Sequence, residues 1–101
     1  MIQIDLPKRN NTTVRVINEN GDIIVGRLHT FRGVTYLSMI VNGTMVSSSE
    51  PCIRDTDFGT MSTRLRYGSF IWLFPYKDED YPYVDNFGTM CQLWYKQPSE
   101  F

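Results

Sequence analysis

Two Asn-Gly pairs, Asn20-Gly21 and Asn42-Gly43, constrain the fold of this chain more than any other feature. Each lies between runs of extended propensity, and Asn-Gly in that setting predicts a β-hairpin, because a type I′ turn needs positive φ at both central residues. Phe31-Arg32-Gly33 reads as a third tight connection. The sequence therefore predicts a four-stranded meander, whose strands are Thr12–Ile17, Asp22–Leu28, Val34–Val41 and Thr44–Ser48.

Side chains alternate with period two along these runs, as they do in strands that bury one face. Val14 and Val16 share one face of the first run, opposite Arg15. The run Val34–Val41 carries apolar residues on both faces, which favours a central or doubly covered position. A shorter strand over Ile2–Leu6 ends at a proline that cannot donate a ladder hydrogen bond.

The second half of the chain is less regular. It predicts a short strand at Cys52–Arg54, an extended run over Arg64–Leu73 that bends at Gly68, and a closing strand over Gly88–Tyr95. Residues 75–86 form a long acidic loop, and the best helix candidate is a single turn near Asp55–Thr63. The expected fold is all-β with little or no helix: a small antiparallel sandwich or partly open barrel built on the meander.

Length and composition place the chain among folded domains. Its 101 residues fit one domain, 1–101, and its 42% hydrophobic and 21% charged residues exclude intrinsic disorder. With a net charge of −1, no strong field draws it to nucleic acid or to a membrane. No stretch approaches the roughly 20 apolar residues of a membrane span, and we expect no secretory leader.

No candidate for chemistry has the spacing that catalysis or metal binding needs. Asp78-Glu79-Asp80 does not match a calcium loop, and Ser47-Ser48-Ser49 lacks the glycines of a nucleophile elbow. His29 is the sole histidine, and Cys52 and Cys91 form no CxxC, so we expect two buried free thiols. The sequence thus predicts no catalytic residue, metal, cofactor or small-molecule substrate, and a protein that is not an enzyme.

Contacts with other proteins remain as the expected activity. The acidic loop interleaves aromatic residues with carboxylates, which suits a protein contact better than a nucleic-acid contact, because phosphates are repelled by acids. The candidate contact residues are Tyr76, Tyr81, Tyr83 and Phe87, with Arg64 and Arg66 as salt partners.

The order of several segments resembles the cyanophage-type baseplate plug family of contractile-tailed bacteriophages. The segments are Ile4-Asp5-Leu6-Pro7, the Asn-Gly hairpin, Gly33–Met39, Leu65–Leu73, Asn86-Phe87-Gly88 and Cys91–Tyr95. Two features depart from the family pattern: Phe87-Gly88 replaces a common Leu-Gly, and Thr56–Thr63 has fewer glycines and leucines.

The resemblance implies a β-rich structural protein of the virion tail, assembled in the host cytoplasm. Such a protein lies near the tail axis in several symmetric copies. There it contacts tube or hub proteins and helps to close the tube before ejection. Two alternatives stay open: a small phage-encoded module that binds a host protein, and a barrel that binds single-stranded nucleic acid through Arg64, Arg66 and Tyr67.

Overall fold

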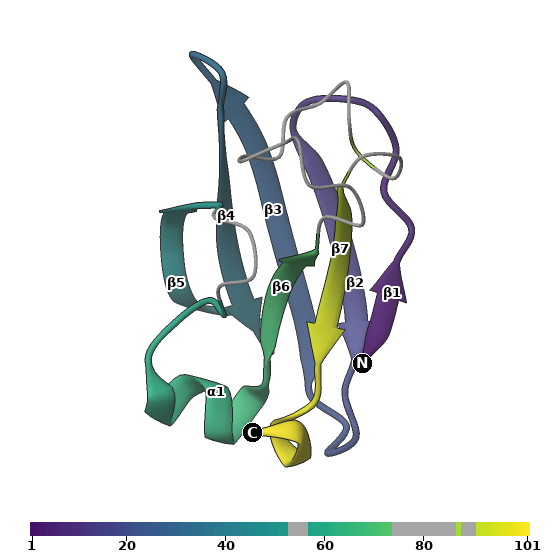
Figure 1. Cartoon of the computed structure of the whole chain (residues 1–101). Helices are drawn as coiled ribbons and strands as arrows, with labels where there is room; N and C mark the ends of the chain where they lie inside the picture. The colour runs from purple at the N-terminus through teal and green to yellow at the C-terminus, as the bar shows by residue number, and fades with distance from the viewer. Residues whose placement is uncertain (53–56, 74–86, 88–90) are drawn as a thin grey trace.

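The computed structural model describes residues 1–52, 57–73, 87 and 91–101. These residues form two antiparallel β-sheets that face each other across one core (Figure 1). One sheet has the order β2-β3-β4-β5 and the other the order β1-β7-β6. The elements are β1 (Ile2–Ile4), β2 (Thr12–Ile17), β3 (Ile23–Phe31), β4 (Val34–Val41), β5 (Thr44–Pro51), α1 (Met61–Tyr67), β6 (Ser69–Leu73), β7 (Gln92–Lys96) and the 3-10 turn η2 (Pro98–Glu100). The expected all-β fold class is confirmed.

The four-stranded sheet is the predicted meander, because its strands pair in chain order. Two of its turns have positive φ at both central residues, as a type I′ turn requires, and one of them is the expected type I′ turn at Asn42-Gly43. In the β3–β4 turn φ is 52° at Arg32 and 78° at Gly33, and in the β4–β5 turn it is 49° at Asn42 and 85° at Gly43.

The β2–β3 turn differs from the expected type I′. Of Asn20 and Gly21, only Gly21 has positive φ, at 83°. The N–H of Asn18 donates to the carbonyl oxygen of Asp22 at 3.0 Å, which leaves a three-residue loop. The side chain of Asn18 explains the longer loop, since its Oδ1 accepts the N–H groups of both Asn20 and Asp22.

The predicted strand faces agree with the burial of the side chains. In β2, Val14 and Val16 are buried and Arg15 is exposed. β4 lies between β3 and β5, as its apolar pattern indicated, and it buries Leu37 and Met39 completely.

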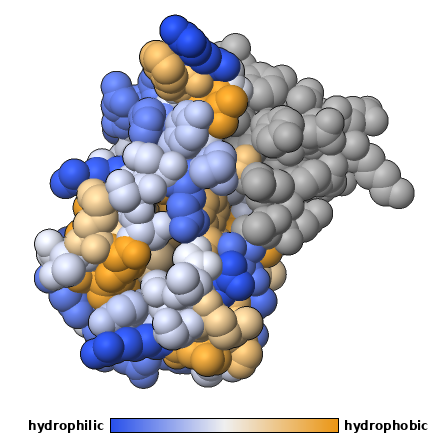
Figure 2. Space-filling view, turned by 90° about the vertical axis from the view of Figure 1, so that its left-hand side faces the viewer, coloured by the Kyte–Doolittle hydropathy of each residue, from blue (hydrophilic) through white to orange (hydrophobic). Residues whose placement is uncertain are grey.

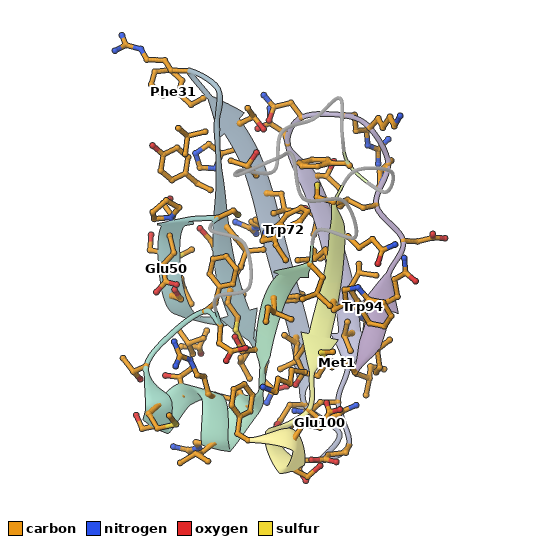
Figure 3. All side chains as sticks on the ribbon, viewed as in Figure 1. Met1, Phe31, Glu50, Trp72, Trp94 and Glu100 are labelled. Carbon is orange, nitrogen blue, oxygen red and sulfur yellow. The ribbon has the colours of Figure 1, made fainter. Side chains whose placement is uncertain are left out.

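Large aromatic side chains of the three-stranded sheet fill the core. Trp72, which lies near the centre of the molecule in Figure 3, stacks on Phe87 with ring centroids 5.4 Å apart. Phe70 meets Tyr95 edge to face at 5.7 Å. Opposite Phe70, a Cβ at Gly26 would lie only 3.2 Å from two atoms of the Phe70 ring. This glycine therefore lets the two sheets approach closely.

The segment before β6 corrects one expectation. Arg64–Tyr67 belongs to helix α1 instead of an extended run, and the strand begins at Ser69. Local capping explains the helix: the Thr60 side chain accepts the N–H of Thr63, and Gly68 ends the helix with φ of 80°. The helix also continues beyond the single turn expected near Asp55–Thr63.

The remaining expectations are confirmed in part. β1 ends at Ile4, two residues before the predicted end, and β5 continues past Ser48 to Pro51. Cys52 follows β5 outside any strand. The rest of the predicted strand at 52–54, the acidic loop at 75–86 and the start of the closing strand at 88–90 lie outside the described residues.

Candidate contact surface

The contact residues predicted from the sequence have different environments. Tyr76, Tyr81 and Tyr83 lie outside the described residues. Phe87 is 2% exposed and stacks on Trp72, so it is a core residue in this structure and not an exposed contact.

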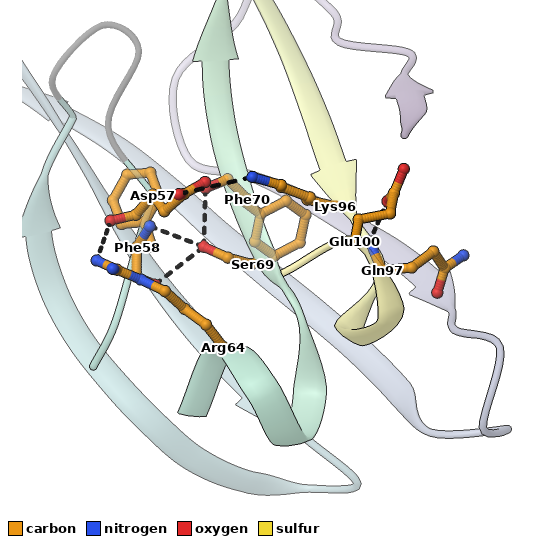
Figure 4. A network of polar contacts seen from close by, with 8 residues as sticks. All are labelled: Asp57, Phe58, Arg64, Ser69, Phe70, Lys96, Gln97 and Glu100. Atoms are coloured by element: carbon orange, nitrogen blue, oxygen red, sulfur yellow. Dashed lines mark hydrogen bonds and ion pairs between the residues drawn. The ribbon is translucent and has the colours of Figure 1, made fainter. Parts of the chain in front are cut away.

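Arg64 and Arg66 both lie on α1 but differ in accessibility. Arg64 is engaged within the chain: its Nε donates to the carbonyl of Phe58 at 3.0 Å and its Nη2 to that of Asp57 at 2.7 Å (Figure 4). Arg66 is exposed, with its guanidinium 5.2 Å from the centre of the Tyr67 ring. Only Arg66 therefore fits the expected role of an accessible cation.

Exposed hydrophobic residues gather at several places on the surface. Figure 2 shows separate apolar patches among polar residues on the side of the molecule that it faces. Met61 and Leu65 of α1 are 58% and 54% exposed, and Phe31, which projects from the tip of the β3–β4 hairpin in Figure 3, is 60% exposed. Scattered exposed apolar residues are ordinary, so a candidate surface needs a second property in the same place.

On the face of the four-stranded sheet that points away from the core, charged side chains lie beside apolar ones. We call it the outer sheet face and define it by Arg15, Val25, Arg27, His29, Tyr36, Ser38, Ile40 and Met45. The strand register places Arg15, Val25, Ile40 and Met45 in one row across the sheet, and Arg27 and Ser38 in the next. The arrangement combines cations with an apolar stripe on a rigid scaffold.

Two adjoining hollows lie on the outer sheet face. The first, of about 300 Å³, is lined by polar side chains that include Arg27, His29 and Ser38. The second, of about 390 Å³, is lined mainly by apolar side chains, including Val25 and Ile40. Arg27 and Met45 line both hollows, so the polar and apolar parts form one continuous depression.

Local contacts order the polar hollow. The Ser38 hydroxyl accepts the N–H of Ser49 at 2.9 Å, which leaves its own proton free to be donated. The His29 ring stacks on Tyr36 with centroids 5.3 Å apart. Both contacts restrict side-chain rotamers in the free protein and so lower the entropy that a partner has to overcome.

The charge of the outer sheet face is unbalanced. Among the described residues, Arg15 and Arg27 form no ion pair. The described carboxylates are used elsewhere, apart from Asp5 next to β1: Glu19 binds Ser99, Asp22 binds Asn42, Glu50 binds Gly59, Asp57 binds Lys96 and Glu100 binds the N-terminus. Counting only residues that the structure describes, the outer sheet face therefore carries two arginines and no carboxylate, although the chain as a whole has a net charge of −1.

Only part of this surface could be predicted from the sequence. Alternation in β2 placed Arg15 opposite the valines, but the convergence of Arg15, Arg27 and Met45 from β2, β3 and β5 depends on the strand register. No sequence motif surrounds His29, and its stacking partner Tyr36 lies on the next strand.

The cysteines have the environment of core residues. Cys52 and Cys91 are buried and form no disulfide, as expected. The pKa of Cys52 is raised to about 12, mainly by burial and to a smaller extent by nearby Cys91 and Glu50. The Trp72 indole N–H opposes part of the rise, although it makes no contact of regular hydrogen-bond geometry. A thiol in this state is a poor nucleophile, since the thiolate is the reactive form.

In the part of the chain that the structure describes, no three His, Cys, Asp or Glu side chains gather into a possible metal site. None of its helices is long and apolar enough to cross a membrane. No protein-family model matches the chain, and a search of curated proteins finds no match to its sequence. The outer sheet face is thus the site that the geometry supports best.

Proposed function

We propose that this chain is a structural protein of a bacteriophage tail, a hub or plug component of the baseplate that works by contacting neighbouring subunits. The order of its sequence segments, which resembles the baseplate plug family, supports the proposal. The observation that carries it is the outer sheet face. There, two arginines that form no ion pair with any described residue adjoin an apolar depression on the sheet. Apolar anchors with charges beside them are typical of specific protein contacts.

The charge of this face defines the kind of partner. A positive, partly apolar surface is complementary to a neighbour that presents carboxylates around an apolar side chain. Copies of the chain arranged around the tail axis would present this face repeatedly, so one contact per subunit suffices for a stable ring. On this proposal the protein has no catalytic role.

An assembly assay with a charge-reversed surface tests the proposal. Arg27→Glu combined with Met45→Glu changes two exposed side chains that line both hollows. The double variant should stay folded but fail to enter phage particles in a complementation assay. Lys8→Glu reverses one positive charge, as Arg27→Glu does, in the exposed segment before β2 and serves as the control. If the double variant enters particles as efficiently as the control, this face is not the assembly contact.

One finding favours a second candidate, binding of single-stranded nucleic acid. The outer sheet face places the stacked rings of His29 and Tyr36 beside Arg27, and bases stack on such rings while arginines neutralise phosphates. Anisotropy titrations with a single-stranded oligonucleotide distinguish the two functions. Affinity that falls steeply with salt and is lost in Arg27→Glu would replace the tail proposal, whereas absence of binding would remove this candidate.

A host-directed binding module remains as the third reading. Such a protein acts in the infected cell and has no place in the mature particle. Its presence or absence in purified particles therefore separates it from a tail component.

A further inference from the structure

Among the strands that the structure describes, β1 and β2 each pair with a neighbour on one side only. β1 ends the three-stranded sheet next to β7, and β2 ends the four-stranded sheet next to β3. No backbone hydrogen bond joins β1 to β2. The two strands nevertheless line one hollow of about 400 Å³, which we call the seam. An edge strand offers unpaired N–H and C=O groups to any extended chain that reaches it.

The ladder pattern shows which groups of β2 face the seam. In the turn after β2, the N–H of Asn18 bonds to Asp22 on the β3 side, so Asn18 belongs to the bonded pairs. Bonded and non-bonded pairs alternate along an antiparallel ladder. The backbone groups of Val14 and Val16 therefore point to β3, and those of Thr13 and Arg15 point away from it.

The bonds of β3 to its other neighbour agree with this alternation. The carbonyl of Ile23 accepts the N–H of Asn42 on the β4 side. Odd-numbered residues of β3 thus bond to β4, and even-numbered residues bond to β2. The outward direction of Thr13 and Arg15 follows from two independent hydrogen bonds.

The same reasoning applies to β1. The carbonyl of Phe70 in β6 accepts the N–H of Phe58, so it faces away from β7. Its partner Tyr95 in β7 then directs its backbone groups to Ile2 of β1. The next residue, Gln3, faces away from β7 and towards the open side of the sheet.

The lining of the seam agrees with these directions. It consists of two unbroken runs, Ile2–Asp5 and Thr13–Val16. Side chains of a strand alternate between faces, so a hollow lined only by side chains would involve every second residue. Consecutive residues on both sides indicate that strand backbone forms the walls. Arg15, which forms no ion pair among the described residues, stands at its rim.

We propose that the seam binds an extended segment of a partner protein, which pairs with the free edge of β2 as an added β-strand. Main-chain bonds to Thr13 and Arg15 supply the affinity, and a carboxylate of the partner pairs with the Arg15 guanidinium. Alternate apolar side chains of the segment pack towards Val14, Val16 and Ile4. The seam adjoins the outer sheet face, because Arg15 belongs to both and Thr13 also lines the polar hollow. The inference does not depend on the phage-tail proposal.

A designed peptide tests the site directly. The probe is the fluorescent peptide Thr-Val-Glu-Val-Thr-Val with blocked ends, and its control has the same composition with the three valines adjacent. Thr13→Pro removes an outward N–H without removing a bond to β3, and Thr13→Ala keeps that N–H. We expect the probe to bind the wild-type protein and Thr13→Ala alike, and to bind Thr13→Pro roughly tenfold more weakly.

Two further measurements keep the test decisive if the proline variant does not fold. Hydrogen exchange of the wild-type protein should show protection of the amides of Thr13 and Arg15 when the probe is bound. Arg15→Glu should weaken binding of the probe and strengthen binding of a version in which lysine replaces glutamate.

Three results would overturn the proposal. The first is equal binding of the probe and its control. The second is protection of amides in β3 and β4 without protection of Thr13 and Arg15. The third is protection of the same two amides because the protein pairs with itself. The last result would assign the seam to a second copy of this chain. None of these measurements involves phage particles, so failure here and failure of the tail proposal are distinguishable.

Discussion

Replacement of Gly68 by alanine should destabilise the protein far more than the same change at any hairpin glycine. Gly68 ends α1 and starts β6 with φ of 80° and ψ of −165°, a region that only glycine adopts readily. A Cβ built there would lie 2.3 Å from the carbonyl oxygen of Lys96. It would also lie 2.4 Å from the hydroxyl of Tyr95. The backbone of β7 has to move to admit it.

The expected cost follows from these two effects. Backbone strain of this kind costs about 1–3 kcal/mol, and forced overpacking adds about 1–3 kcal/mol. Gly33→Ala is the matched control, because its φ is 78° and nothing lies within 4 Å of its Cβ. An alanine that adopts the left-handed conformation without any steric clash is about 1–2 kcal/mol less stable than glycine there. The effect of alanine on the unfolded chain is the same in both variants and cancels in the comparison.

Urea and thermal denaturation of the two variants measure the difference. Gly68→Ala should be about 2 kcal/mol less stable than Gly33→Ala, which in a domain of this size lowers Tm by about 8–16 °C. If the two variants unfold within about 0.5 kcal/mol of each other, the close approach of β7 to Gly68 does not exist in solution.

Three further predictions concern buried or paired groups. Ser69→Ala removes a hydroxyl that accepts the N–H of Phe58 at 2.7 Å and should cost about 1–3 kcal/mol in denaturant melts. Thiol titration at pH 8 should find Cys52 unreactive until the protein unfolds, because burial raises its pKa to about 12. The N-terminal ammonium and the N–H of Gln97 lower the pKa of Glu100. The ionised Glu100 carboxylate therefore stabilises the fold at a pH above the ordinary carboxyl pKa of about 4.3. This stabilisation is lost as the pH falls through the lower pKa that Glu100 has in the folded protein.

Each of these has its own control. Ser62→Ala removes an exposed hydroxyl of α1 and should change stability by less than 0.5 kcal/mol or so. Rapid labelling of Cys52 in the native state would contradict the buried thiol. Glu100→Gln should flatten the acid limb of the stability curve, and an unchanged limb would show that the pair with the N-terminus, 2.5 Å in length, contributes nothing.

Local signals in the sequence were enough for the meander but not for the opposite sheet. Turn residues and alternation over Thr12–Val41 act within a few residues, so they predict β2, β3 and β4 closely. The helix at Met61–Tyr67 was missed because the extended propensity of Arg64–Tyr67 is overridden by caps at Thr60 and Gly68. Asn18 changed a turn type in the same way, through side-chain bonds that a dipeptide pattern does not reveal.

The surface was harder to predict than the fold, for a physical reason. Arg15, Arg27 and Met45 are separated by ten residues or more along the chain and meet only through cross-strand register. Aromatic content identified contact candidates by type but not by burial, and Phe87 proved to pack in the core. The free edge of a strand such as β2 cannot be predicted from amino-acid composition, because its binding groups are backbone N–H and C=O groups.

Quantitative mass spectrometry of purified phage particles, produced from the genome that encodes this chain, tests the central claim most directly. The account predicts that the chain is present at a fixed copy number relative to the tail tube protein, a multiple that fits the symmetry of the tail axis. If the chain is absent from intact particles but abundant in infected cells, it acts on another target and the structural role is wrong.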